Sequence, residues 1–395
     1  MTQTYSATSY WLDNELWTRI RNIVVLVLMV SWLAAAVGWF TDSQRFDYSY
    51  FCGFVYFITI GFGGLFFLMM QFLTGAAWSV TVRRFMETVA ASLPVGLVLF
   101  VPVAFALPEL YEWARPSHDP LVQAKASYLN PAFFVIRAAI YLGIWSLWGV
   151  AIYRQSTQQD GTRSIENMRA ASRWSAPGLV ITLITASLAA FDWVMSLDPR
   201  WYSTIFGIYM LAGGGVAFIA VITLISLAFR RAGVLKSAIT VEHYHDLGKW
   251  LFALTVFWAY IAFSQYLLIW YANLPDETIF YKVRLAGSWT VWSALLMVGH
   301  FLVPFAFLLG RAAKRNLTVL GGMAVWILAM HFVDIYWLIM PTFSKRGINL
   351  NWMDFVALLA IGSAFALAFW LRLGRKALVP VGDLRFEQGL AFKNV

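Results

Sequence analysis

The chain has 395 residues, of which 61% are hydrophobic and only 12% are charged, and its mean hydropathy is +0.68. Soluble domains carry about a quarter charged residues, so the composition excludes a soluble protein and predicts an integral membrane protein. The net charge of +9 does not indicate a nucleic-acid partner, because the basic residues lie in loops between apolar segments. The single cysteine, Cys52, excludes an internal disulfide and any cysteine-based metal or iron–sulfur site.

The elements predicted along the chain are all membrane-spanning helices. The first twenty residues are polar and aromatic and lack a short apolar core with a cleavage site, so we expect no signal peptide. A span needs roughly 20 apolar residues. Ten spans are predicted, at about 21–40, 50–75, 85–107, 132–153, 174–196, 201–229, 248–272, 284–310, 317–341 and 352–373. The loops between them are too short for a soluble or nucleotide-binding domain. We therefore expect an all-α polytopic membrane protein.

The distribution of lysine and arginine predicts the orientation of the spans. Ten is an even number, so both termini lie on the same side of the membrane. The termini and the loops after spans 2, 4, 6 and 8 carry 20 of the 29 basic residues, and the opposite side carries 9. Positively charged loops remain in the cytoplasm, so we expect both termini to be cytoplasmic.

Polar motifs recur at corresponding places in two groups of spans. Asp192 in span 5 and Asp334 in span 9 each precede a proline by seven residues. Spans 4 and 8 share the pattern Arg-x7-Trp-Ser, which begins at Arg137 and at Arg284. The common order of these motifs predicts two tandem four-helix units of the same orientation, spans 2–5 and 6–9, flanked by single helices. Glycine clusters in spans 2 and 6 would allow close helix packing.

This repeat predicts the division of the chain. We expect a cytoplasmic N-terminal segment at 1–20, the first transmembrane helix and an outer loop at 21–49, the first four-helix unit at 50–200, the second four-helix unit at 201–343, the tenth transmembrane helix at 344–374 and a cytoplasmic tail at 375–395.

The two intramembrane carboxylates need partners. A carboxylate near the bilayer centre costs at least about 2.5 kcal/mol and normally faces a bundle interior. Spans 4 and 5 can bring Arg137 to Asp192, and spans 8 and 9 can bring Arg284 to Asp334. Each pair has two interpretations: a static ion pair that fixes helix register, or a gated protonation site.

The second unit has further titratable groups. His331 lies one helical turn before Asp334, and His300 in span 8 lies inward of both. These three residues could form a polar ladder, and histidine titrates near neutral pH, which suits proton relay. The stretch EHYHDLGK at the start of span 7 could feed the ladder, or it could be a solvated helix start. The complete set of candidate proton-path residues is Asp334, His331, His300, Asp192, Arg284, Arg137, Lys249, Glu87, His245 and Asp246. Two histidines within the spans are too few to predict haem, and no metal site is predicted.

Two long stretches, FDWVMSLDPRWYSTIFGIYMLAGG and YHDLGKWLFALTVFWAYIAFSQYLLIWYANLPDET, resemble the ActF-type membrane subunits of alternative complex III. This complex is the bacterial quinol:cytochrome c oxidoreductase, and the wider family is that of NrfD/PsrC-like membrane subunits. The resemblance covers nearly the whole chain. It implies a non-catalytic subunit of the bacterial inner membrane without a redox cofactor of its own, which provides a proton path in a respiratory or photosynthetic chain.

The same resemblance implies partners and cofactors that the residues themselves do not show. The partners would be an ActC-like quinol-binding membrane subunit, an iron–sulfur protein and c-type cytochromes, besides the surrounding lipids; nucleic acid is not expected. Haem c and iron–sulfur clusters would belong to those partners, and a quinone or menaquinone contact is left open. Two other classes remain open: a stand-alone proton-coupled secondary transporter and a purely structural membrane anchor.

Overall fold

The computed structural model describes residues 10–345, 347–374 and 376–394. Ten helical segments are long and apolar enough to cross a membrane, as the sequence predicts. Seven are single helices: α1 (Asn14–Thr41), α2 (Ser43–Thr74), α7 (Pro131–Thr162), α9 (Phe206–Arg231), α10 (Val241–Ala272), α15 (Leu317–Phe343) and α16 (Trp352–Leu373). Three are composite: α3 (Val80–Ala91) with α4 (Val95–Phe105), α8 (Ile165–Trp193) with η3 (Met195–Leu197), and α12 (Trp289–Leu295) with η4 (Leu296–Leu302) and α13 (Val303–Leu309).

Short helices outside the spans lie in the connections and in the tail. They are α5 (Leu107–Leu110), η2 (Glu112–Ala114), α6 (Pro120–Ala124), α11 (Pro275–Arg284), α14 (Arg311–Arg315) and α17 (Phe386–Leu390). The chain is thus an all-α polytopic membrane protein, and no strand occurs in the part of the chain that the structure describes.

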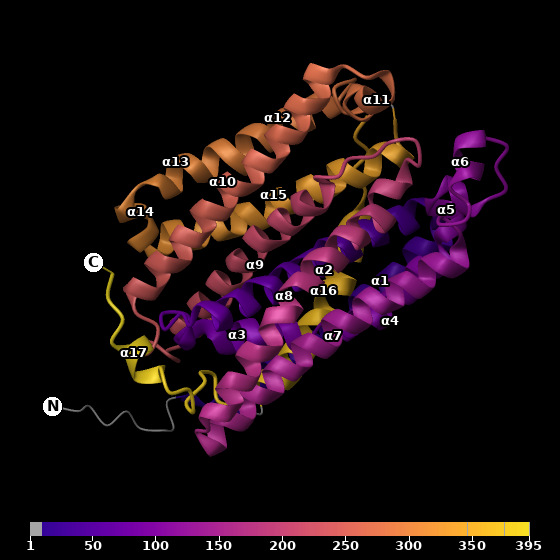
Figure 1. Cartoon of the computed structure of the whole chain (residues 1–395). Coiled ribbons are helices and arrows are strands. Elements are labelled where there is room, and N and C mark those ends of the chain that lie inside the picture. Colours follow the sequence, from indigo (N-terminus) through magenta and orange to yellow (C-terminus); the bar gives the residue numbers. More distant parts are fainter. Residues whose placement is uncertain (1–9, 346, 375, 395) are drawn as a thin grey trace.

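The spans pack as two four-helix bundles that meet along α2 and α9. The first bundle contains α2, α3 with α4, α7 and α8, and the second contains α9, α10, α12 with α13, and α15. Figure 1 shows the orange helices of the second bundle and the violet and magenta helices of the first on opposite sides of this junction. Helices α1 and α16 pack against each other and against α2, outside both bundles.

Glycines allow α2 and α9 to approach closely. A Cβ atom added at Gly63 of α2 would lie 2.6 Å from the carbonyl carbon of Gly214 in α9. A Cβ atom at Gly214 would overlap the backbone carbonyl of Thr59. Small residues at a helix interface are the usual means of packing membrane helices, because lipid supplies no hydrophobic driving force between them. The two glycine clusters therefore fix the junction of the two bundles.

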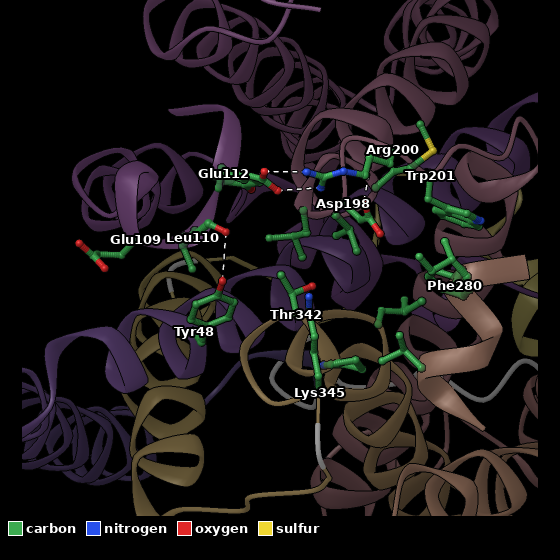
Figure 2. Close-up of a pocket in the computed structure, with 18 of the residues that line it drawn as sticks. Tyr48, Glu109, Leu110, Glu112, Asp198, Arg200, Trp201, Phe280, Thr342 and Lys345 are labelled. Carbon is green, nitrogen blue, oxygen red and sulfur yellow. Dashed lines mark hydrogen bonds and ion pairs between the residues drawn. The ribbon is translucent and has the colours of Figure 1, made fainter. Parts of the chain in front are cut away.

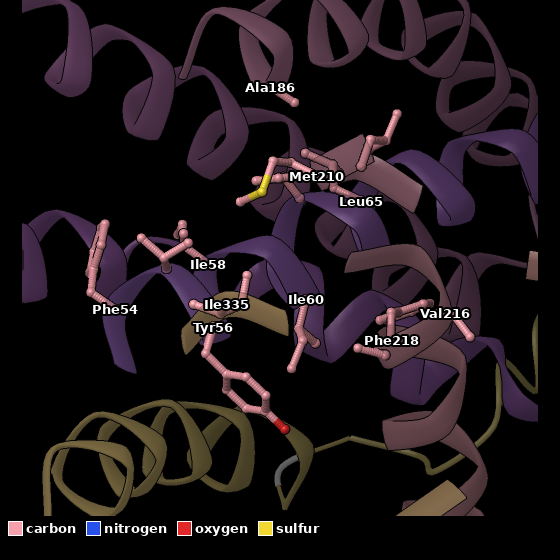
Figure 3. Close-up of a cluster of buried hydrophobic side chains, with 14 of the residues drawn as sticks. Phe54, Tyr56, Ile58, Ile60, Leu65, Ala186, Met210, Val216, Phe218 and Ile335 are labelled. Atoms are coloured by element: carbon pink, nitrogen blue, oxygen red, sulfur yellow. The ribbon is translucent and has the colours of Figure 1, made fainter. Parts of the chain in front are cut away.

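The hydrophobic core lies at this same junction. Figure 3 shows buried side chains from α2, α8, α9 and α15 converging there, among them Ile58, Ala186, Met210 and Ile335. In this core Ile58, Ala186 and Ile335 are at most 1% exposed. Because α2 and α9 are largely buried from end to end, polar groups on them and on the helices that face them are shielded from lipid.

Two spans, the third and the eighth, are interrupted in their interior, and both interruptions lie next to prolines. The third span breaks between α3 and α4, next to Pro94, which lacks the backbone N–H that would continue the helix. The eighth span contains the π-helical turn η4, which includes His300 and precedes Pro304. Trp326 donates to the carbonyl of Gly299 from its indole N–H (2.7 Å), which satisfies a backbone acceptor in this irregular turn.

Two details differ from the sequence-based expectation. Pro341 does not end the ninth span, because α15 continues to Phe343. Arg284 does not lie in the eighth span, because it is the last residue of the separate helix α11 and the span begins at Trp289. The repeat of Asp-x6-Pro and Arg-x7-Trp-Ser motifs is therefore not matched by identical local structure in the two bundles.

Gly214→Ala tests the role of the helix junction. The new methyl group would overlap the Thr59 backbone, which cannot move without separating α2 from α9, so we expect a loss of about 3 kcal/mol or more. Gly143→Ala in α7 is the matched control, since a Cβ atom there meets no atom within 4 Å; it should leave the stability unchanged or raise it. Thermal unfolding in detergent measures both, and equal melting temperatures would contradict the assignment.

Candidate functional site

Asp192, the carboxylate of the first bundle, is paired as the sequence predicts. It lies in the last turn of α8, is 1% exposed, and accepts hydrogen bonds from Arg137 Nε (2.7 Å) and Nη2 (3.1 Å). The hydroxyl of Tyr141, one turn along α7, donates a third hydrogen bond (2.9 Å). Tyr128 covers the guanidinium: its carbonyl accepts from Nη1 (2.9 Å) and its ring lies 3.8 Å away. This bidentate, fully bonded pair has the geometry of a static link between two helices.

Asp334, the carboxylate of the second bundle, has no such cation. It is 1% exposed, and it accepts hydrogen bonds from the hydroxyl of Tyr209 in α9 and from the indole N–H of Trp258 in α10 (3.1 Å). Among the described residues it forms no ion pair. Burying a charge without a partner is costly, so proton uptake relieves the cost at Asp334 but not at the ion-paired Asp192.

The expected pairing of Arg284 with Asp334 is wrong. Arg284 donates instead to three backbone carbonyls: Nε to Trp337 (3.0 Å), Nη2 to Leu338 (2.7 Å) and Nη1 to Phe280 (3.0 Å). The physical reason lies in α15. Pro341 has no N–H to donate to the carbonyl four residues earlier, so the Trp337 carbonyl is available to the guanidinium. Asp334 lies a further turn inward.

The two intramembrane histidines lie next to this carboxylate. The ring of His300 stacks on Trp258 with 3.9 Å between ring centroids, and Trp258 also donates to Asp334. His331 shares a hydrogen bond between Nε2 and the Thr59 hydroxyl (2.9 Å) and packs against Tyr56. No hydrogen bond directly joins His300, His331 and Asp334 among the described residues, and the polar ladder stays a prediction. His300 and Asp334 are joined through the Trp258 ring instead.

Several buried polar atoms around Trp258 have no protein partner in the described part of the chain. They are Nδ1 of His331, both ring nitrogens of His300 and the hydroxyl of Thr255. Gly213 faces this region: a Cβ atom there would lie 3.5 Å from both the His331 ring and the Trp258 ring. Buried polar atoms without a protein partner can bond to water. Both histidines therefore keep ring nitrogens that no described protein group occupies.

Glu87 of α3 belongs to a buried charge cluster at the end of the first bundle that contacts the C-terminal tail. Arg83 Nε donates to it (3.0 Å), and Arg84 lies 3.4 Å away. Arg84 also donates to Asp160 in α7 (2.6 Å), and Arg83 pairs with Asp383 of the C-terminal tail. Glu87 is therefore part of a buried ion-pair network.

The EHYHDLGK stretch lies at the start of α10, at the end of the second bundle that contacts the C-terminal tail. Lys249 pairs with Asp246 and is 48% exposed. His245 is buried, and its Nδ1 has no partner among the described residues. Leu247 and Leu251, both fully buried, separate Asp246 from Thr255 over nine residues of α10, roughly 14 Å. Proton transfer from Lys249 to the two intramembrane histidines, as expected from the sequence, therefore cannot run through protein hydrogen bonds alone.

A cavity of 540 Å³ opens between the two bundles, at the end that carries α5 and α11 (Figure 2). Val194, two residues after Asp192, and Leu338, four residues after Asp334, both line it. Phe206 lines it as well and stacks on Tyr209, the hydrogen-bond donor to Asp334, with 6.0 Å between centroids. Both intramembrane aspartates thus lie close to one cavity at this end of the bundles.

The wall of this cavity carries charged residues. Arg200 donates two hydrogen bonds to Glu112 (2.7 and 2.8 Å) and also pairs with Asp119. These bonds lower the pKa of Glu112 below its ordinary value and raise the pKa of Arg200. Figure 2 shows Asp198 and Lys345 across the same space. The cavity therefore has charged groups in a partly apolar wall, and it can hold water and small ions.

A second hollow is an apolar groove of 780 Å³ on the outside of the bundles, between α15 and the pair α1 and α16. Tyr56 and Trp292 line it, but their polar atoms are engaged: Tyr56 donates to the Leu328 carbonyl (3.2 Å) and Trp292 to the Val333 carbonyl (2.9 Å). The groove therefore offers no free donor at these two side chains, and it suits an alkyl chain better than a polar head group.

The fold and the site together define a class, a polytopic membrane protein with a buried, cation-free carboxylate beside two histidines. No model of a known protein family matches the chain, and no curated protein is detectably similar to it. Within the described residues, no group of three or more His, Cys, Asp or Glu side chains could hold a metal ion.

Sequence reasoning missed the residues that distinguish the two aspartates. Tyr209 and Trp258 donate to Asp334, and Thr59 bonds to His331. Trp258 follows Thr255 by one helical turn on the buried face of α10. The sequence therefore contains a signal for this position, because the two polar side chains share one face of the helix. Thr59 and Tyr209 carry no comparable signal, because they come from helices that pack against the site from other parts of the chain.

Removal of one charged group at each aspartate site should change the stability of the protein by different amounts. Arg137→Gln leaves Asp192 buried without its cation, which should cost about 3–5 kcal/mol, and the double variant Arg137→Gln/Asp192→Asn should recover most of that loss. Asp334→Asn removes no ion pair and should change stability by less than about 1 kcal/mol. Unfolding in detergent checks both, and a larger loss for Asp334→Asn than for Arg137→Gln would refute the contrast.

Proposed function

We propose that this chain is a proton-conducting membrane subunit of a quinol-oxidising electron-transfer complex, of the ActF type of alternative complex III. One observation carries the proposal. Asp334 is buried with two neutral hydrogen-bond donors, no ion-pair partner among the described residues, and two histidines nearby. A carboxylate in this setting is costly when charged, so a small change in its surroundings shifts its proton occupancy.

The neighbouring groups have distinct tasks in this proposal. His300 and His331 pass protons between the inner half of the bundle and Asp334, since their free ring nitrogens can bind and release protons. Tyr209 and Trp258 hold the carboxylate in place, and the Tyr209 hydroxyl is the relay group on the side of the cavity that carries α5 and α11, which faces outward in this proposal; Phe206 only packs against its ring. The proton leaves through that polar cavity. In the first bundle, the ion pair of Asp192 keeps α7 and α8 in register.

The assignment to a complex is supported by the resemblance of two long stretches to ActF-type subunits. In that setting the chain is a non-catalytic subunit of a bacterial inner membrane with both termini in the cytoplasm. An ActC-like membrane subunit would bind quinol, and an iron–sulfur protein and c-type cytochromes would carry the electrons. Movement of charge in those partners would provide the change in surroundings that loads or unloads Asp334.

A quinone contact is a weaker part of this proposal. The lipid-side groove has the size and apolar lining for an isoprenoid chain. However, the hydroxyl of Tyr56 and the indole N–H of Trp292 already donate to backbone carbonyls. A quinone head group needs hydrogen-bond partners for its carbonyl oxygens. The groove therefore supports contact with a quinone or lipid tail rather than a redox-active quinone site.

The main alternative is a stand-alone proton-coupled transporter. Such proteins often interrupt corresponding helices of their two repeats around a central site. Here the interruptions fall in the third span, next to Pro94, and in the eighth, before Pro304. These are the second span of one bundle and the third span of the other, so they do not correspond. This mismatch favours the subunit over the transporter.

Purification from native membranes tests membership of a complex. A tagged chain should co-purify with polypeptides that carry haem c and iron–sulfur clusters, which absorption and electron paramagnetic resonance spectra detect. A chain that purifies alone, in a form that moves a solute with protons in liposomes, would establish the transporter instead.

Asp334→Asn tests the proton path in that assembly. The substitution keeps the shape of the side chain and removes its titrating group, so assembly and cytochrome content should be unchanged. The protons moved per electron, or the turnover with quinol, should fall by about tenfold or more. Asp192→Asn is the matched control and should have a smaller effect. Unchanged turnover and proton yield in Asp334→Asn would reduce the site to a structural role and favour the membrane anchor.

A further inference from the structure

The C-terminal tail crosses the cytoplasmic ends of both bundles. Figure 1 shows it in yellow, running from the end of α16 past α3 towards the start of α10. It contains α17 and ends, within the described residues, at Asn394. The tail is therefore placed to contact the cytoplasmic mouth of each bundle.

Its first part is anchored on the first bundle. The carboxylate of Asp383 is fully buried and pairs with Arg83 of α3. Burial alone would raise the pKa of Asp383, but the guanidinium of Arg83 outweighs it and holds the pKa below the ordinary value. Gly382 lies so close to the backbone of Gln159 that a Cβ atom would overlap it. This part of the tail is a fixed attachment.

Its last part covers the mouth of the second bundle. The carbonyl of Gly389 bonds to His243 Nε2 (2.9 Å). Asn394 accepts from Lys249 Nζ (2.7 Å), and its side-chain amide donates to the Glu242 carbonyl (3.0 Å). With the tail in place His243 is fully buried.

The two contacts of the tail differ in strength. The pair at Asp383 is inaccessible to solvent on both sides, whereas Lys249 at the other end is 48% exposed. Exposed hydrogen bonds contribute little net stability, because water competes for the same groups. The end of the tail can therefore detach while its anchor holds.

We infer that residues 391–394 form a lid over the proton entrance of the second bundle, with Asn394 as its latch on Lys249 and Glu242. The inference rests on the proposed proton path to Asp334. With the lid closed, His243, His245 and Asp246 are buried, while Lys249 beside them is partly exposed. With the lid open, these groups face the cytoplasm directly and proton entry is faster.

The experiment measures proton uptake by the full chain, in its native assembly in liposomes, with a pH-sensitive dye under an applied potential. Asn394→Ala removes two side-chain hydrogen bonds and should increase uptake by about fivefold. Truncation after Leu390 removes the lid but keeps Asp383 and Gly389, and should increase uptake at least as much. Glu387→Gln, at an exposed carboxylate of the same tail, is the control and should leave uptake unchanged.

Measurements on the Asp334→Asn variant distinguish a failure of the proposed lid from a failure of the proposed proton path. If the path is correct, Asp334→Asn has low uptake and truncation does not restore it. If Asp334→Asn conducts like the unmodified chain, the proposed path fails. If Asp334→Asn blocks uptake but Asn394→Ala and the truncation leave the unblocked chain unchanged or slower, the path stands and the lid is overturned. Protease cleavage in the tail, which should be faster in Asn394→Ala, confirms that the latch has opened.

Discussion

The cost of burying a carboxylate away from water governs the arrangement of this protein. Both intramembrane aspartates are 1% exposed, and each must be compensated. Arg137 compensates Asp192 with a bidentate ion pair, which links α7 to α8. Among the described residues, Asp334 receives the neutral donors Tyr209 and Trp258 and no cation. The ion pair of Asp192 gives a rigid pair of helices. Asp334, which has neutral donors instead, is a group whose charge depends on whether it binds a proton.

The rest of the fold keeps that second solution stable. Close packing of Gly63 against Gly214 brings α2 next to α9, so Thr59 reaches His331 and Tyr209 reaches Asp334. Phe206, which stacks on Tyr209, lines the cavity at the end that carries α5 and α11. Glycine packing, the buried donors and the cavity thus belong to one unit, in which the junction between the bundles shields the site.

The ten spans and the Arg137–Asp192 pair could be predicted from the sequence, because hydropathy and helical spacing are local properties. The partner of Asp334 could not. Its motif copies that of Asp192, but Arg284 ends a separate helix and binds the Trp337 carbonyl that Pro341 leaves free. The recurring motif therefore places a carboxylate in both bundles without placing the same partner beside it. The contact of the tail with Lys249 also depends on tertiary packing, since the two residues are 145 positions apart.

The central claim is that Asp334, and not Asp192, exchanges a proton. Infrared difference spectroscopy across a pH titration tests it directly, because a protonated carboxyl group has its own C=O stretching band, separate from that of a carboxylate. The account predicts a titrating carboxylic-acid band that disappears in Asp334→Asn and persists in Asp192→Asn. A band that survives in Asp334→Asn, or one that is lost only in Asp192→Asn, would contradict it.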